Sequence, residues 1–515
     1  RPAAAGRSPR AEPEWLVDAM VVPSAIQALV EVCGSRKILR GLEGELAGER
    51  GDAWRKIRPR GRPLPEPLIP AAEQSNTNAV LGGEMILKLY RKLEPGVHPE
   101  LEVSRHLAER HFPAAPRIAG WFEYRTERRD PMTVGLLLGF IPNVGDAWSF
   151  ALDAIDRYVE RVLVDAASLS GPDLAPPGSL ASHSPVSGAA GAEATAPASE
   201  ADSAAPALAL TSMAAPATPP AIDLHSPRVL LAAAELDLSL GRAEPSAEAR
   251  ERIGYVLDDF RLIGRRTAEV HLALADSDDP GFAPEPFTPF YQRSLYQSLR
   301  NRAERTLRLL RTQQPSLEED LRPVAAGVLE RRESILRRLR SVAQTNLGGM
   351  RIRTHGDYHL GQVLRTGADF VVIDFEGEPG LSLSARRTKR SPLRDVAGML
   401  RSFEYAGTMG MRRAQEAGLV LRGQESGVRE RIDAWVGAVS EVFLRAYLEV
   451  MDSSGLLPAQ AEARGLLLDV LVLEKLLYEV EYELENRPQW LRVPLRRLWA
   501  ALGGDGAGQG GLTTA

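Results

Sequence analysis

The segment from residue 354 to 379, THGDYHLGQVLRTGADFVVIDFEGEP, constrains the fold of this chain more than any other. Its second half predicts a hairpin of two short apolar strands around a Gly-containing turn at 366–369. The turn would carry Asp374, at the end of the second strand, back beside Gln362. Asp357 lies five residues before Gln362, which is a loop's reach. We therefore expect these three side chains to face one cleft.

The chemistry of that cleft follows from its residue types. Asp357 can orient an attacking hydroxyl as a base, while the amide oxygen of Gln362 and the carboxylate of Asp374 can hold Mg²⁺ on nucleotide phosphates. Phosphoryl transfer needs mainly such positioning and charge neutralisation. A surface loop with a few carboxylates is the structural alternative. His355 and His359 could also indicate a metal pair, but they lie in a loop and no third ligand stands nearby.

A second hairpin, at residues 78–90, precedes a helical pattern at residues 99–109. Lys88 lies inside its second strand, and Glu100 and Glu102 lie on the helix. Kinases use an ion pair between a strand lysine and a helix glutamate to hold the α- and β-phosphates. Of the two glutamates we prefer Glu102, because apolar residues flank it. A lysine on a strand usually just faces solvent, so this prediction depends on the motif at 354–379.

No Gly-rich phosphate loop precedes the hairpin. A polar turn stands there instead, and we expect Ser75, Asn76 and Thr77 to cradle phosphate with hydroxyl, amide and backbone N–H groups. An ordinary polar turn is the alternative. The only G-x-G-x-x-G match, at residues 506–511, follows the last helical pattern without a preceding strand, so we expect no phosphate site there.

Composition excludes several classes of protein. The 515 residues carry a net charge of −5, which offers no basic field for nucleic acid. Cys33 is the single cysteine, so no internal disulfide can form, and we expect a cytoplasmic protein. No apolar run approaches the roughly 18 residues that a membrane span needs. The chain begins at Arg1 rather than Met, and we expect that it is a piece of something longer.

The order of elements predicts a bilobal α+β protein. Residues 14–62 mix helix-like periodicity with a basic stretch, residues 63–141 hold most of the expected strands, and residues 142–502 are mostly helical. Residues 169–227 are rich in Ala, Pro, Ser and Gly, so we expect a disordered insertion there and a flexible tail at 503–515. Helical periodicity occupies six stretches of the second part: 249–263, 291–311, 316–345, 393–403, 429–451 and 464–485.

Together these motifs resemble the maltokinases, kinases that are similar in fold to aminoglycoside phosphotransferases and protein kinases. The resemblance covers most of the chain outside the insertion, and Gln362, where most kinases have Asn, is itself a feature of that family. Residues 15–60 look like a shortened N-terminal cap of maltokinases. The whole is similar to the maltokinase part of trehalose synthase–maltokinase fusions. The matching segments are 73–78, 87–96, 142–148, 355–362, 374–379, 391–398 and 482–490.

The resemblance implies a protein-kinase-like fold, with a cap, an antiparallel N-lobe sheet and a helical C-lobe. It implies ATP- and Mg²⁺-dependent phosphorylation of maltose at the anomeric hydroxyl, which gives maltose 1-phosphate for α-glucan synthesis. Asp357 would be the base, and Gln362 and Asp374 the Mg²⁺ ligands. Glu376 would face the metal or the sugar. Asp395 would anchor the backbone of the catalytic loop.

A sugar site needs planar polar groups and an aromatic face. Tyr482, Arg487 and Trp490 offer these at the end of a helix, although a helix end packed on the core is the alternative. Two other functions stay open. One is a related kinase for glucosamine or an aminoglycoside, and the other is a pseudokinase that serves a fused partner as a binding module.

Overall fold

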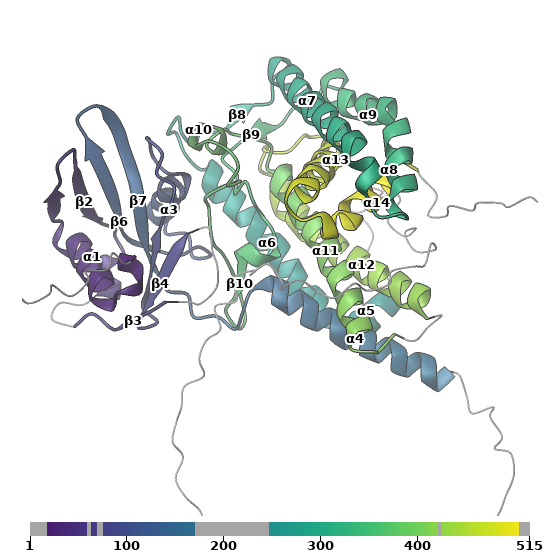
Figure 1. The fold of residues 1–515 in the computed structure, drawn as a ribbon, viewed down its shortest axis with the longest axis horizontal. Coiled ribbons are helices and arrows are strands. Elements are labelled where there is room, and N and C mark those ends of the chain that lie inside the picture. Colours follow the sequence, from purple (N-terminus) through teal and green to yellow (C-terminus); the bar gives the residue numbers. More distant parts are fainter. Residues whose placement is uncertain (1–17, 59–62, 70–75, 170–246, 421–423, 504–515) are drawn as a thin grey trace, which may run out of the picture.

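The computed structural model describes residues 18–58, 63–69, 76–169, 247–420 and 424–503. Ser75, nearly all of the expected insertion and nearly all of the expected tail lie outside these ranges. Within them, no helix is long and apolar enough to cross a bilayer. Two lobes lie side by side, a sheet-rich one and a larger helical one (Figure 1), which confirms the expected bilobal α+β class.

The smaller lobe is built on one antiparallel sheet of seven strands, in the order β1-β2-β6-β7-β5-β4-β3. The segment expected as a cap supplies β1 and β2, and β2 pairs with β6. The cap therefore extends the N-lobe sheet. The elements of this lobe are η1 (Ala19–Val21), α1 (Pro23–Ser35), β1 (Ile38–Arg40), β2 (Glu45–Arg50), α2 (Trp54–Ile57), β3 (Pro67–Leu68), β4 (Thr77–Leu81), β5 (Met85–Leu89), α3 (Pro99–Glu109), β6 (Ile118–Thr126) and β7 (Arg129–Gly139).

The hairpin of β4 and β5 forms where the sequence predicts it. Gly82 and Gly83 both have positive φ (55° and 66°), which glycine adopts without steric cost. The turn sets the register that pairs Asn78 with Lys88. Helix α3 begins at Pro99, whose fixed φ suits a first helical position. The lobe thus presents Lys88 on a central strand beside a short helix.

The connection between the lobes also pairs with the catalytic region. Val144 and Gly145 exchange backbone hydrogen bonds with Arg365 at 2.8 and 2.9 Å. Arg365 ends β10 (Val363–Arg365), which forms an antiparallel hairpin with β11 (Phe370–Val372). The hairpin that carries Gln362 and Asp374 therefore sits at the junction of the lobes, where Figure 1 shows β10.

The larger lobe packs long helices around buried aromatic rings. Phe260 meets the rings of Phe403 and Trp435 edge-on at 5.3 and 5.5 Å between centroids. The elements not yet named are α4 (Ala147–Leu169), α5 (Ala247–Ile253), α6 (Val256–Ala275), β8 (Glu285–Pro286), α7 (Pro289–Gln313), η3 (Gln314–Ser316), α8 (Leu321–Glu330), α9 (Arg332–Gln344), β9 (Met350–Arg351), η4 (Leu360–Gln362), α10 (Leu383–Arg386), α11 (Leu393–Glu416), α12 (Glu425–Met451), α13 (Ala461–Asn486), η5 (Pro488–Trp490) and α14 (Arg492–Ala501).

Two helical predictions were wrong in detail. In the pattern at 249–263, a turn at Gly254 and Tyr255 separates α5 from α6. The pattern at 316–345 is two helices, α8 and α9, rather than one. Pro323 lacks the N–H that a helix interior requires, so it fits only in a first turn, and α8 begins at Leu321. Arg331 then leaves helical geometry (ψ 16°) and separates the two helices.

Candidate active site

A buried carboxylate on α11 holds the loop at 353–359, here called the catalytic loop after the role expected of Asp357. Asp395 accepts hydrogen bonds from the backbone N–H groups of His355 (2.7 Å) and Gly356 (3.0 Å). His271, on α6, lies 3.0 Å from the same carboxylate. Burial alone would raise the pKa of Asp395, but His271 and the backbone donor lower it below its usual value. Asp395 thus makes the contacts that the sequence analysis expected of it.

Asp357 projects from this anchored loop toward α13. Its side chain is 29% exposed, and Oδ1 lies 3.9 Å from Nζ of Lys475. His355, two residues earlier, lies 2.8 Å through Nε2 from the carbonyl oxygen of Ile373. The residue next to Asp374 is therefore tied to the loop that carries Asp357, although the two carboxylates are 17 positions apart in sequence.

The hairpin brings Gln362 and Asp374 together as predicted from the turn. Nε2 of Gln362 donates to Oδ2 of Asp374 at 3.0 Å, and the N–H of Ile373 donates to the carbonyl of Gln362 at 3.0 Å. Asp374 has φ 67°, a left-handed conformation that Asp and Asn tolerate better than most residues. This backbone kink turns the carboxylate out of the strand and toward the sheet-rich lobe.

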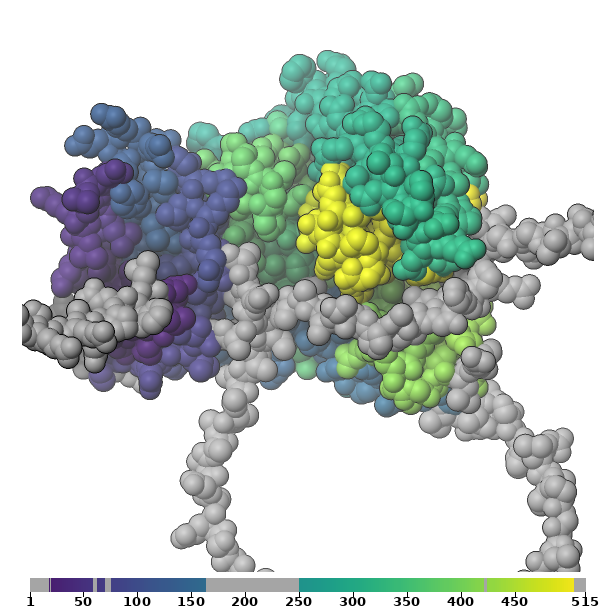
Figure 2. Space-filling model, in the orientation of Figure 1, coloured from purple at the N-terminus to yellow at the C-terminus, as the bar shows by residue number. Residues whose placement is uncertain are grey.

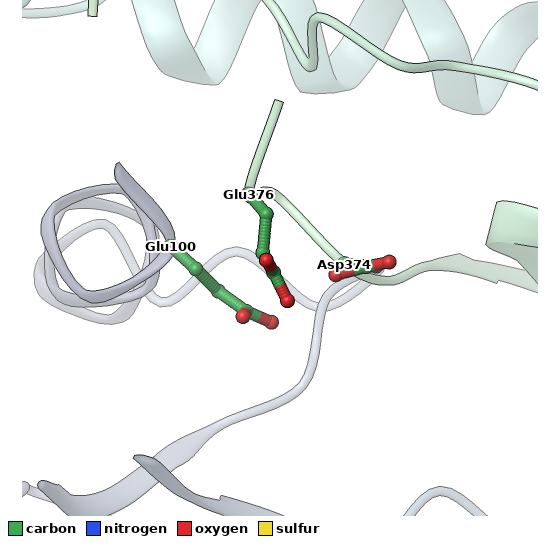
Figure 3. A group of neighbouring side chains, drawn as sticks. All are labelled: Glu100, Asp374 and Glu376. Atoms are coloured by element: carbon green, nitrogen blue, oxygen red, sulfur yellow. The ribbon is translucent and has the colours of Figure 1, made fainter. Parts of the chain in front are cut away.

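Lys88 meets three carboxylates at the lobe interface. Its Nζ lies 2.8 Å from Glu100 and 2.5 Å from Asp374, and it also pairs with Glu376. Figure 3 shows Glu100 reaching from its helix toward Asp374 and Glu376, which come from the loop after β11. The OH of Tyr90 donates to Glu100 at 2.7 Å. Sequence reasoning missed Tyr90, which could have been found from its alternation with Lys88 along the strand.

Charge and burial oppose one another in this cluster. Burial alone would lower the pKa of Lys88, but the carboxylates raise it well above its usual value. Burial and the Asp374 and Glu100 carboxylates raise the pKa of Glu376 to about 7, against the effect of Lys88. Lys88 therefore stays charged, while Glu376 titrates near neutral pH.

The preference for Glu102 as the partner of Lys88 was wrong, because Glu100 fills that place. Successive residues of a helix are about 100° apart around its axis. The side chains of Glu100 and Glu102, two residues apart, therefore point in nearly opposite directions. Glu102 instead pairs with Arg353 and Arg387. Apolar neighbours in sequence do not reveal which face of a helix a residue occupies, and that is where the inference failed.

The acidic cluster fits a divalent cation. Among the described residues, Glu100, Asp374 and Glu376 form the group whose ligand atoms all lie within 4.8 Å of one another. When all three carboxylates are ionised, the cluster with the single ammonium of Lys88 carries a net charge of −2. The charge of Mg²⁺ would neutralise it. Lys88 contacts all three carboxylates, but the side chain of Glu100 is only 3% exposed, against 33% for Asp374 and 12% for Glu376. Asp374 and Glu376 are therefore the carboxylates better placed to bind a hard cation. Gln362 would join them through its amide oxygen.

The two histidines of the loop, His355 and His359, form hydrogen bonds with backbone groups. His355 lies against the carbonyl of Ile373, and Nδ1 of His359 accepts from the N–H of Gly361 at 3.1 Å. Neither belongs to the metal-ligating group found among the described residues. These contacts favour a structural role over a zinc site.

Of the polar turn before β4, Asn76 and Thr77 are described. Asn76 donates through Nδ2 to Glu376, so it reaches across the lobe interface to the acidic cluster. Thr77 begins β4 and is partly exposed. Asn76 therefore reaches the carboxylates that surround Lys88.

A small pocket beside the catalytic loop is lined by residues of α13, of α11 and of the loop itself. Its walls include Gly356, Glu378, Glu474, Lys475 and Tyr478. The spacing of 474, 475 and 478 places these side chains on one face of the helix. Sequence reasoning missed them, although they lie one to two turns before the predicted Tyr482.

The predicted sugar residues lie farther along the same helix. Tyr482 is 38% exposed, and its ring stacks near that of Tyr478 at 6.1 Å between centroids. Arg487 pairs with Glu483 at 2.8 Å and lies over the Tyr482 ring. Trp490 lies near Arg412 of α11, 6.0 Å from the ring centroid. Tyr482 thus continues the aromatic face of the pocket, whereas Arg487 and Trp490 pack at the helix end.

The fold is a bilobal, kinase-like one, and the chain is similar to known phosphotransferases. Residues 194–430, somewhat less than half of the chain, match the phosphotransferase enzyme family (APH). These findings support membership of the kinase-like superfamily.

Two curated relatives are named glucosamine kinase. The protein from Mycolicibacterium smegmatis is 28% identical over 260 residues, which are 50% of this chain and 57% of that protein. The protein from Streptacidiphilus jiangxiensis is 31% identical over 148 residues, 28% of this chain and 30% of that protein. The chain therefore spans little more than half the length of one relative and under a third of the other.

Solved structures share the fold at low identity. A glucosamine kinase in complex with glucosamine, ADP and inorganic phosphate has a TM-score of 0.53 and 18% identity, covering 93% of this chain and 82% of that one. Another, termed crystal form B, has a TM-score of 0.55 and 16% identity, covering 96% and 98%.

Proposed function

We propose that this protein transfers the γ-phosphoryl group of ATP to a hydroxyl group of a sugar. The observation that carries the proposal is the convergence of Lys88, Asp374, Gln362 and Asp357 at one lobe interface. They come from three parts of the chain: β5, the stretch that holds both Asp357 and Gln362, and the segment after β11. Phosphoryl transfer asks for positioned charge and an oriented hydroxyl, and these groups are suited to both.

Each residue has a distinct task in this proposal. Lys88, held by Glu100, meets the nucleotide phosphates, and Asp357 accepts the proton of the attacking hydroxyl. Gln362, Asp374 and Glu376 hold Mg²⁺, which when bound neutralises the phosphate charge. Asn76 and Thr77, at the start of β4, contact the phosphates from the sheet-rich lobe. The anchored loop keeps Asp357 still while the hydroxyl approaches.

The pocket charges favour a neutral sugar as acceptor. Its carboxylates already have cationic partners: Glu378 and Glu474 pair with Arg394 at 3.3 and 2.9 Å, and Lys475 faces Asp357. Because these carboxylates are already paired, a sugar with an ammonium group would gain little there. Among neutral sugars, maltose phosphorylated at its anomeric hydroxyl is the acceptor that the family resemblance implies. Tyr478 and Tyr482 offer the aromatic surface that sugar rings stack on.

Glucosamine is the second candidate, favoured by the names of the curated relatives and of the similar structures. A coupled assay of ADP release with ATP, Mg²⁺ and maltose, glucosamine, glucose or kanamycin separates these acceptors. We expect the highest kcat/KM for maltose. A preference for glucosamine would reverse the choice of acceptor, and ADP release without any dependence on a sugar would favour a binding module instead.

A further inference from the structure

The two glutamates of α3 connect the helix to opposite sides of the molecule. Glu100 holds Lys88, whereas Glu102 faces the helical lobe. Arg387 donates to both carboxylate oxygens of Glu102, at 2.9 and 2.7 Å, and Arg353 donates to one of them at 2.6 Å. One carboxylate therefore joins three segments that are far apart in sequence.

Both arginines belong to segments that carry the site. Arg353 begins the catalytic loop, four residues before Asp357. Its side chain is 2% exposed, and its guanidinium lies 5.2 Å from the centroid of the Phe282 ring. A buried guanidinium needs a charged partner, and Glu102 is the ion-pair partner that the structure gives Arg353 among the described residues.

Arg387 ends the segment that follows Asp374. Its neighbour Arg386 donates to the carbonyls of Leu381 and Pro379 at 2.8 and 2.7 Å, which folds that segment on itself. A bidentate arginine–carboxylate pair fixes direction as well as distance. Glu102 thus holds two parts of the chain against α3: the start of the catalytic loop, and the end of the segment that follows Asp374.

The ion pairs of Glu102 with Arg353 and Arg387, here called the bridge, differ from the ion pairs of Lys88 in what happens when a nucleotide binds. Phosphates and Mg²⁺ would compete for Lys88, Asp374 and Glu376, so those contacts between the lobes must rearrange. The contacts of Glu102 are made by the opposite face of α3, and they can persist throughout. They are therefore suited to keep the lobes in register during the reaction.

We propose that Glu102 is a positioning residue that holds α3, and with it the Glu100–Lys88 pair, in register with the loop of Asp357. The inference rests on the proposed phosphoryl transfer. Burial opposes the charge of Glu102, but Arg387 and Arg353 lower its pKa below the usual value, so the bridge stays ionised at neutral pH. Misplacing reacting groups by about 1 Å can cost on the order of 10²-fold in rate.

The test compares Glu102→Gln with Glu109→Gln, an exposed glutamate on the same helix that loses the same charge. We expect Glu102→Gln to lower kcat roughly 10- to 100-fold while KM for the sugar changes little. Arg387→Gln, at a side chain 39% exposed, should do the same in a protein that folds. The double variant should be no worse than Glu102→Gln alone, because the contact that Arg387→Gln removes is one of the two that Glu102→Gln removes.

Hydrogen exchange provides a readout that is independent of turnover. We expect amides at residues 98–109 and 351–357 to exchange faster in Glu102→Gln and Arg387→Gln than in wild type or Glu109→Gln. An active wild type with unchanged kcat in both bridge variants would overturn the proposal, as would a lower melting temperature without loss of kcat. If wild type phosphorylates no sugar, the proposed function fails, and unchanged exchange in both regions would separately overturn the bridge.

Discussion

Gln362 donates through Nε2 to the Oδ2 atom of Asp374 at 3.0 Å, across the base of the β10–β11 hairpin. The pair links the end of the catalytic loop to the left-handed residue that follows β11. To bind a cation together, the two must present oxygen atoms to it, so the amide of Gln362 has to turn over. Asp374 can bind the cation without such a change, whereas Gln362 cannot. We therefore expect substitutions of the two residues to change the Mg²⁺ requirement to different extents.

We expect Asp374→Asn to abolish most activity and Gln362→Ala to raise the Mg²⁺ concentration needed for half-maximal rate. Asn keeps the left-handed backbone of residue 374 without strain, so the loss reports the missing charge. High Mg²⁺ should partly rescue Gln362→Ala, because a neutral amide is the weaker ligand. Initial rates across a Mg²⁺ titration provide the measurement. An unchanged Mg²⁺ requirement in both variants would contradict the metal assignment.

Lys88→Met should lower kcat/KM for ATP by roughly 10²-fold or more, because it removes a preorganised charge in a site shielded from water. KM for the sugar should hardly change. Lys92→Met is the matched control, since Lys92 is exposed and pairs with Glu94 on the surface. Steady-state kinetics with each substrate varied in turn would show the difference. Equal kinetics of the two variants would mean that Lys88 does not meet the nucleotide.

The raised pKa of Glu376 predicts a pH-dependent stability. In the folded protein the group holds its proton up to about pH 7, whereas an unfolded glutamate releases it near its usual value. Its contribution to the free energy of unfolding is therefore fully present at low pH and is lost as pH rises to about 7. Urea denaturation in EDTA at several pH values, for wild type and Glu376→Gln, measures it.

The difference in unfolding free energy between wild type and Glu376→Gln should shift against wild type by up to about 3 kcal/mol from pH 5 to pH 8. A difference that stays constant over this range would show that Glu376 is not buried among carboxylates. Saturating Mg²⁺ should remove most of the shift, because the cation replaces the proton.

Tyr478→Ala should raise KM for the sugar more than Trp490→Ala does. Tyr478 lines the pocket with Lys475, whereas Trp490 lies beyond the helix end near Arg412. Loss of a stacking surface removes binding shared by ground state and transition state, so kcat should fall less than KM rises. KM for ATP serves as the internal control. A larger effect of Trp490→Ala would move the sugar site to the end of α13.

Local features of the sequence predicted much of this structure. The β4–β5 hairpin follows from Gly82 and Gly83, and the juxtaposition of Gln362 and Asp374 follows from a turn of a few residues. Asp395 was expected through family resemblance, and its contacts with the loop are as that resemblance implied. In these cases the determinants are close in sequence or are carried by a recognisable motif.

What sequence could not supply is the orientation of helices against the rest of the fold. Choosing Glu100 over Glu102 requires knowing which face of α3 meets Lys88, and both glutamates turn out to be engaged. Lys475 and Tyr478 carry no motif signal of their own, and they matter because α13 crosses beside Asp357. The contact between Asp357 and Lys475 joins residues more than a hundred positions apart, and no periodicity encodes it.

The most direct test of the central claim is phosphoryl transfer to the sugar by wild type and Asp357→Asn, with ATP binding measured in parallel. Asn preserves the shape of the loop and removes the base, so we expect kcat to fall roughly 10²-fold or more while the Kd for ATP changes little. Asp369→Asn, in the turn between β10 and β11, is the control and should keep kcat. An Asp357→Asn variant with near-wild-type turnover would contradict the account.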